Sequence, residues 1–188
     1  MAAIATKDAV TPWVTQIFVY HCHMSRPRTI PDADVFTAIL RLIAEGGEKS
    51  VAFSSVARAT GLSAPSLVQR YGALPEMIHA ALLHAWTQID ASTSAAIVES
   101  SVAAKGPQAL LKALGAGPNL AILAASLRHA TLRDRAKAWR QRVETALADK
   151  AGDRDAATIL FAAWQGQALW DGISDKSFKL KDAIKRLG

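Results

Sequence analysis

The stretch Ser54–Gly72, "SSVARATGLSAPSLVQRYG", decides the fold, because it holds two short helix-forming segments on either side of a glycine. Ala57 is small enough for two helices to cross closely. Gly61, four residues later, can take the left-handed backbone conformation that a tight turn needs. Leu62 and Leu67 then supply apolar anchors for the second segment. This spacing is typical of a helix-turn-helix, although a plain hairpin of helices can also produce it.

Helix-capping residues are expected to mark the ends of both short helices. Ser54 or Ser55 starts the first helix, and Ser63 caps the second. Pro65 falls in the first turn of the second helix, where a missing N–H is tolerated, and Gly72 ends that helix.

Helical patterning continues on both sides of this stretch. Upstream, Asp32 or Asp34 is expected to cap a helix that ends at Gly46–Gly47, and downstream a longer helix opens at Pro75–Glu76. After residue 100, glycine and proline residues separate five further helical segments. The sequence therefore predicts an all-α protein of about nine helices, with a three-helix helix-turn-helix N-terminal domain and a C-terminal helical bundle. The expected divisions are residues 1–29 as an N-terminal extension and arm, 30–90 as the helix-turn-helix domain, and 91–188 as the C-terminal domain.

Composition favours one compact helical protein. The chain has 188 residues, of which 51% are hydrophobic, and its single cysteine, Cys22, excludes an intramolecular disulfide. No apolar run approaches the roughly 20 residues of a membrane span, and the N-terminus lacks the pattern of a signal peptide. We therefore expect a reducing, cytoplasmic setting and no membrane association. The net charge is +6, and the basic surplus lies after residue 90, so the local absence of acidic residues between Lys49 and Pro75 is the more useful signal.

A second plausible chain start lies at Met24, in "MSRPRTIPDADVF". The residues before it match nothing downstream in pattern. We expect residues 1–23 to be a dispensable extension or the product of a misassigned start codon.

Residues 30–90 resemble the N-terminal domain of the TetR family of bacterial transcriptional regulators. The resemblance rests on "AILRLIAEGG" and on "VARATGLSAPSLVQRYGALPEMI". It implies a homodimer that binds a palindromic double-stranded DNA operator and, as a repressor, is released by a small-molecule effector. Three positions depart from the family pattern: Val68 replaces a tyrosine, Leu74 a lysine and Ala52 a threonine. The tyrosine and lysine commonly hold phosphates in the family.

The resemblance places the second short helix in the major groove of DNA. Gln69 can form paired hydrogen bonds with adenine, and Arg70 can reach guanine or a phosphate. Ala64 and Pro65 can touch thymine methyl groups. Arg26 and Arg28 can form a flexible arm. The candidate DNA-binding residues are Ser54, Ser55, Ala64, Pro65, Ser66, Gln69, Arg70 and Tyr71. Outside the motif, Gln69 and Arg70 would be ordinary solvated residues, and Tyr71 suits the edge of a core at least as well as a DNA contact.

The C-terminal half would supply the effector pocket and the dimer interface. Tryptophans at helical spacing usually belong to a core, so the lining set is a weaker hypothesis. Its members are Trp86, Leu123, Leu127, Trp139, Phe161, Trp164, Gln165 and Trp170. The segment "ATILFAAWQGQALW" is apolar nearly all round, which favours a dimer contact, and Gly166 would permit close approach of a partner helix.

The histidines and the cysteine of the sequence give little support for catalysis or metal binding. His21, Cys22 and His23 are adjacent and point in different directions, so they cannot close a tetrahedral metal site alone. His79, His84 and His129 lack a recognised ligand spacing. We expect no enzyme, no metal and no cofactor. The alternative to a DNA-binding regulator is a helical ligand-binding or protein-interaction module that has lost DNA binding.

Overall fold

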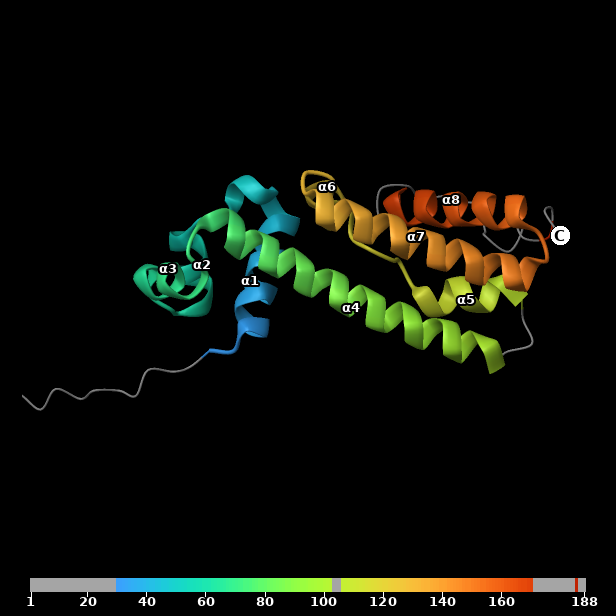
Figure 1. Ribbon diagram of the computed structural model, residues 1–188, viewed down its shortest axis with the longest axis horizontal. Helices are drawn as coiled ribbons and strands as arrows, with labels where there is room; N and C mark the ends of the chain where they lie inside the picture. Colours follow the sequence, from blue (N-terminus) through green and yellow to red (C-terminus); the bar gives the residue numbers. More distant parts are fainter. Residues whose placement is uncertain (1–29, 103–105, 171–184, 186–188) are drawn as a thin grey trace, which may run out of the picture.

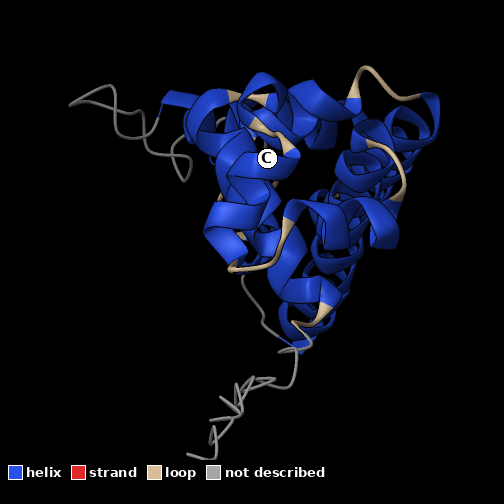
Figure 2. Ribbon diagram, turned by 90° about the vertical axis from the view of Figure 1, so that its left-hand side faces the viewer, coloured by secondary structure: helices blue, strands red, loops and turns tan. Residues whose placement is uncertain are grey.

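The computed structural model describes residues 30–102, 106–170 and Lys185 (Figure 1). These residues form eight α-helices and one short 3-10 helix, and the described part contains no strand (Figure 2). The bounds are α1 Asp32–Gly46, η1 Glu48–Ser50, α2 Phe53–Thr60, α3 Ala64–Tyr71, α4 Leu74–Val102, α5 Gly106–Leu114, α6 Leu120–Ser126, α7 Ala130–Ala151 and α8 Arg154–Trp170. The all-α prediction is confirmed. The segment before residue 30 lies outside the described ranges, and so does the ninth predicted helix except for Lys185.

Helix α1 packs across the beginning of α4 at one end of the molecule (Figure 1). Its buried side chains, Val35, Ile39 and Ile43, recur every four residues and so share one helical face. The prediction of an aspartate cap is wrong, because Pro31 occupies the N-cap position without a side-chain hydrogen bond. Asp32 and Asp34 lie instead in the first turn, where carboxylates interact favourably with the helix dipole.

Helices α2 and α3 form the predicted helix-turn-helix. Gly61 follows α2 with φ 76° and ψ 5°, in the left-handed conformation that glycine adopts without strain. Ser63 caps α3, since its Oγ accepts a 3.2 Å hydrogen bond from the N–H of Ser66. Leu67 is fully buried, and Leu62 packs against the same core, so both anchors hold α3 in place.

Helix α4 is 29 residues long and joins the helix-turn-helix to the remaining helices without a break (Figure 1). The predicted division between residues 90 and 91 falls inside this helix and remains a prediction. Within the described residues, no helix is both long and apolar enough to cross a membrane.

Helices α5, α6 and α7 pack against α4, and α8 packs against α7. A cluster of aromatic residues from α4, α7 and α8 lies between them. Trp86, Trp139, Phe161 and Trp164 are all buried, with neighbouring ring centroids 5.8 to 6.4 Å apart. The three indole N–H groups donate hydrogen bonds to Ser126 Oγ, Thr93 Oγ1 and the Gly115 carbonyl oxygen, at 2.8, 2.9 and 2.8 Å. Satisfying these donors removes the free-energy penalty of burying them.

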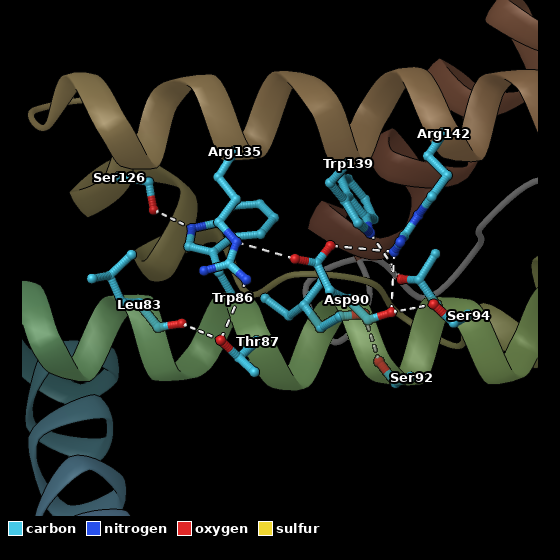
Figure 3. A network of polar contacts seen from close by, with 12 residues as sticks. Leu83, Trp86, Thr87, Asp90, Ser92, Ser94, Ser126, Arg135, Trp139 and Arg142 are labelled. Atoms are coloured by element: carbon cyan, nitrogen blue, oxygen red, sulfur yellow. Dashed lines mark hydrogen bonds and ion pairs between the residues drawn. The ribbon is translucent and has the colours of Figure 1, made fainter.

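A polar network fixes α7 against α4 (Figure 3). Asp90 Oδ2 accepts a hydrogen bond from Arg135 Nε at 3.1 Å. Arg142 Nη2 donates to Asp90 Oδ1 at 3.2 Å and to its backbone carbonyl oxygen at 3.1 Å. Arg135 and Arg142 lie about two helical turns apart on α7, and their guanidinium groups meet at a single carboxylate, which sets the register of the two helices.

Candidate nucleic-acid interface

Helix α3 carries six of the eight predicted DNA-binding residues, and three of them lie on its outer side. Pro65, Ser66 and Gln69 are exposed, whereas Ala64 is half-buried at the start of the helix. Ser66 also takes part in the cap, because its Oγ lies 2.7 Å from Ser63 Oγ. Since the buried face of α3 is anchored on the core, these side chains occupy a fixed surface.

The first turn of α2 contributes two serines with different environments. Helix α2 begins at Phe53, one residue before the predicted start. Ser54 is exposed. Ser55 is half-buried, and its hydroxyl is engaged with the carbonyl oxygens of Ser50 and Ala52 at 3.0 and 2.9 Å and with the Ala52 N–H at 2.9 Å. Of the two serines, Ser54 is therefore the one that is accessible at the surface.

Arg70 is bound to the beginning of α1. Its Nη2 lies 2.7 Å from Asp32 Oδ1, and its Nη1 donates a 2.8 Å hydrogen bond to the Ile30 carbonyl oxygen. The Arg70 side chain keeps 31% of its surface exposed. Two of its donor groups thus tie the end of α3 to α1, an arrangement that the sequence analysis did not anticipate.

Tyr71 joins the same cluster. Its hydroxyl donates to Asp32 Oδ1, and its ring lies 5.9 Å from Phe36 and 5.5 Å from the Arg70 guanidinium carbon. Burial, and then the Asp32 carboxylate, raise the pKa of Tyr71, so the phenol remains a donor. Tyr71 is half-buried and lies at the edge of the core.

Val68 is a surface residue that sequence reasoning treated only as a departure from a family pattern. It is 45% exposed, and it lies three residues after Pro65 and beside Gln69 on the outer face of α3. The helical spacing from the buried Leu67 could have identified it. Asp32 was also missed as the partner of Arg70, because nothing in the local pattern connects the two.

The predicted ligand-lining residues separate into three groups. Trp86, Trp139, Phe161 and Trp164 form the buried aromatic cluster described above. The exposed residues are Leu127, at 61%, and Trp170, at 59%. Leu123 and Gln165 line a pocket of about 600 Å³ between the α5–α6 loop and the second half of α8. The residues around this pocket are Ala116, Gly117, Pro118, Asn119, Leu120, Leu123, Gln165, Gly166, Ala168 and Leu169.

One polar atom at this pocket has no partner. Gln165 Nε2 is buried, and it has no hydrogen-bond acceptor within the described ranges. Gly117 faces it with φ 71°, and a Cβ at this position would lie 2.8 Å from both Gln165 Nε2 and Trp164 Cη2. The close approach of the loop to α8 therefore depends on glycine.

The structure brings together two of the histidines that appeared unrelated in sequence. The His79 and His129 rings have centroids 5.3 Å apart, while His84 lies 5.3 Å from Phe36. Across the described residues, no group of three His, Cys, Asp or Glu side chains could hold a metal ion. The His21–His23 cluster lies outside those residues.

Comparison with solved structures identifies the fold. No protein-family model matches the chain, and no curated protein matches its sequence. A TetR-family member from Streptomyces coelicolor A3 is 22% identical, with 84% of this chain and 96% of that chain covered and a TM-score of 0.57. The multidrug binding protein EbrR, solved with malachite green, is 22% identical, with 83% and 95% covered and a TM-score of 0.60. A proposed transcriptional regulator from Saccharomonospora viridis, solved with choline, is 16% identical, with 83% and 92% covered and a TM-score of 0.59.

The chain therefore has the all-α fold of TetR-family transcriptional regulators. The resemblance of residues 30–90 to that family predicted this fold. The likeness covers 84% of the chain and so extends well beyond the helix-turn-helix.

Proposed function

We propose that this protein is a TetR-like, DNA-binding transcriptional regulator that acts in the cytoplasm. The observation that carries the proposal is the helix-turn-helix itself: a short α3, anchored by the buried Leu67 and capped by Ser63, whose outer side chains are exposed. A helix presented in this way fits the width of the major groove. The first turn of α2, with Ser54 exposed, adds backbone N–H groups that suit a phosphate.

A homodimer is proposed because one α3 gives too small a contact for useful operator specificity. The surface of α8 supports this assembly. Its inner face is buried against the other helices, while Ile159 and Leu169 are 50% and 46% exposed along its outer face, with Ala162 and Gly166 between them. Adding a Cβ to Gly166 would meet nothing within 4 Å, so a partner helix has room to approach. A two-fold dimer implies a palindromic operator.

The proposed repressor is released by a small molecule bound at the pocket beside Gln165. The pocket has a size suited to such ligands, and its lining is mostly apolar. The unpartnered Gln165 Nε2 offers a hydrogen bond that a ligand acceptor would complete. Two proteins of the same fold were solved with malachite green and with choline, which supports ligand binding without identifying the ligand of this chain.

A matched pair of charge substitutions tests DNA binding. Ser54 and Thr131 are both the second residue of a helix, and both are exposed. A glutamate at either position favours helix stability. Ser54→Glu should abolish binding to duplex DNA, because it places a carboxylate where a phosphate is expected, whereas Thr131→Glu should bind as the parent protein does. Fluorescence anisotropy at two salt concentrations measures both.

The parent protein should lose affinity steeply with salt. If it binds no duplex even at low salt, the alternative of a helical module without DNA affinity replaces this proposal. Equal binding by the two glutamate variants would exclude α2 from the interface.

A further inference from the structure

The outward stripe of α3 has a chemistry that indicates which bases it can read. Pro65, Val68 and Gln69 are exposed and follow the i, i+3, i+4 spacing of one helical face. Two of these side chains are apolar, and the third is an amide. None of the three carries a charge.

Arg70, the basic residue of α3, already makes contacts within the protein. Arg70 binds Asp32 Oδ1 at 2.7 Å and the Ile30 carbonyl oxygen at 2.8 Å, and its guanidinium lies against the Tyr71 ring. A guanidinium held in this way turns its paired donors toward α1. To read a base it would have to leave both acceptors, and the Asp32 carboxylate would then lose its positive partner and keep only the Tyr71 hydroxyl as a donor.

Each base is recognised in the major groove by a different kind of side chain. Guanine is read most often by the paired donors of arginine or lysine, adenine by the amide of glutamine or asparagine, and thymine by apolar contact with its methyl group. The α3 stripe offers an amide for adenine and apolar side chains for thymine. It has no free arginine or lysine for guanine.

We propose that Pro65, Val68 and Gln69 read A·T base pairs at the centre of each operator half-site, and that Arg70 is a positioning residue that holds α3 against α1 through Asp32. This inference rests on the proposed function. It adds the class of sequence that the same surface recognises.

Selection of bound duplexes from a random pool tests the base preference. The full-length protein should enrich half-sites with A·T pairs at their centre. Gln69→Ala should lose about 5- to 150-fold in affinity for the selected adenine, the range expected for one bidentate pair, and should become indifferent to its replacement by other bases. Arg70→Ala should weaken binding to all sequences alike and leave the selected bases unchanged.

Replacing thymine by uracil in the selected half-site removes only the methyl group. This change should weaken the parent protein about threefold to fivefold per methyl contacted, in line with the transfer free energy of one such group. Val68→Ala should respond less to the same change, because it has lost the contacting side chain. Uracil placed outside the half-sites is the control and should affect neither protein.

The outcomes separate this inference from the proposed function. Selected half-sites centred on guanine, with a preference that disappears in Arg70→Ala, would overturn the assignment of α3. Equal response of the parent protein and Val68→Ala to uracil would remove Val68 from the interface. Binding to no duplex at all would overturn the proposed function and this inference together.

Discussion

The indole nitrogen of Trp86 donates a 2.8 Å hydrogen bond to Ser126 Oγ, which joins α4 to the last residue of α6 inside the core (Figure 3). Both residues are fully buried. The Ser126 hydroxyl also donates to the Ile122 carbonyl oxygen at 2.6 Å, so its orientation is fixed by its own helix. A buried donor and acceptor of this kind stabilise the fold mainly because leaving either one unpaired is unfavourable.

Ser126→Ala should lower the free energy of unfolding by about 1–3 kcal/mol, because it leaves the Trp86 N–H buried without an acceptor. Urea denaturation followed by circular dichroism measures the change. Ser92→Ala, on the exposed side of α4, is the control and should change stability by less than about 0.5 kcal/mol. Equal effects of the two substitutions would show that the Trp86–Ser126 hydrogen bond contributes nothing to stability.

Asp90→Ala should destabilise the protein by about 1–2 kcal/mol, because Arg135 and Arg142 lose their shared carboxylate. This magnitude is reduced for the partial exposure of all three side chains. The control is Asp134→Ala, which removes an exposed aspartate on α7. Comparing the melting temperatures of the two variants separates the loss of the network from the loss of one negative charge. A melting temperature for Asp90→Ala no lower than that of the control would contradict this role.

Gly61→Ala should destabilise the helix-turn-helix by about 1 kcal/mol, because φ is 76° at this position. A Cβ there meets nothing within 4 Å, so the effect comes from backbone conformation alone. Asparagine tolerates this conformation better, and Gly61→Asn should recover part of the loss. Chemical denaturation of the three proteins measures it. An alanine variant as stable as the parent protein would argue against the left-handed turn.

Ile159→Lys should convert a dimer to a monomer at micromolar concentration, because a lysine on the outer face of α8 would be buried without a partner in the proposed interface. Sedimentation equilibrium measures the association. Ala138→Lys, at an exposed position of α7, is the matched control and should leave the mass unchanged. A parent protein that sediments as a monomer would exclude the dimer directly.

Gln165→Leu should raise the melting temperature of the ligand-free protein, because it replaces a buried N–H that lacks an acceptor with an apolar group of similar size. Differential scanning fluorimetry measures the shift. A clear fall in the melting temperature would instead show that the amide has an essential partner.

Local sequence signals predicted the helix-turn-helix well. Gly61 and Ser63 act through the conformation and hydrogen bonds of their immediate neighbours, so their roles could be inferred from a few residues. The prediction that an aspartate caps α1 was wrong, because Pro31 occupies the N-cap position and sets its extended conformation.

Contacts between distant residues could not be inferred in the same way. The pairing of Arg70 with Asp32 depends on how α3 lies against α1. Trp86 and Trp139 were assigned to a ligand pocket, yet their rings pack against each other and their N–H groups are satisfied within the protein. The sequence contains tryptophans at the right spacing for either role, and only the packing decides between them.

Because of the aromatic cluster, tryptophan spectroscopy reports on only one end of this protein. Trp86, Trp139 and Trp164 all belong to the cluster, and their centroid separations of 6.0 and 6.4 Å are short enough for electronic coupling. Residues 30–73, which include α1 to α3, contain no tryptophan. Once Trp13 is replaced, the tryptophan emission of the chain, excited beyond the absorption of tyrosine, comes from the bundle and from Trp170 at the end of α8. Loosening of the helix-turn-helix would leave that emission unchanged, whereas a ligand in the pocket beside Gln165 would alter it without a label, because Gly117 of the pocket lies against the Trp164 ring.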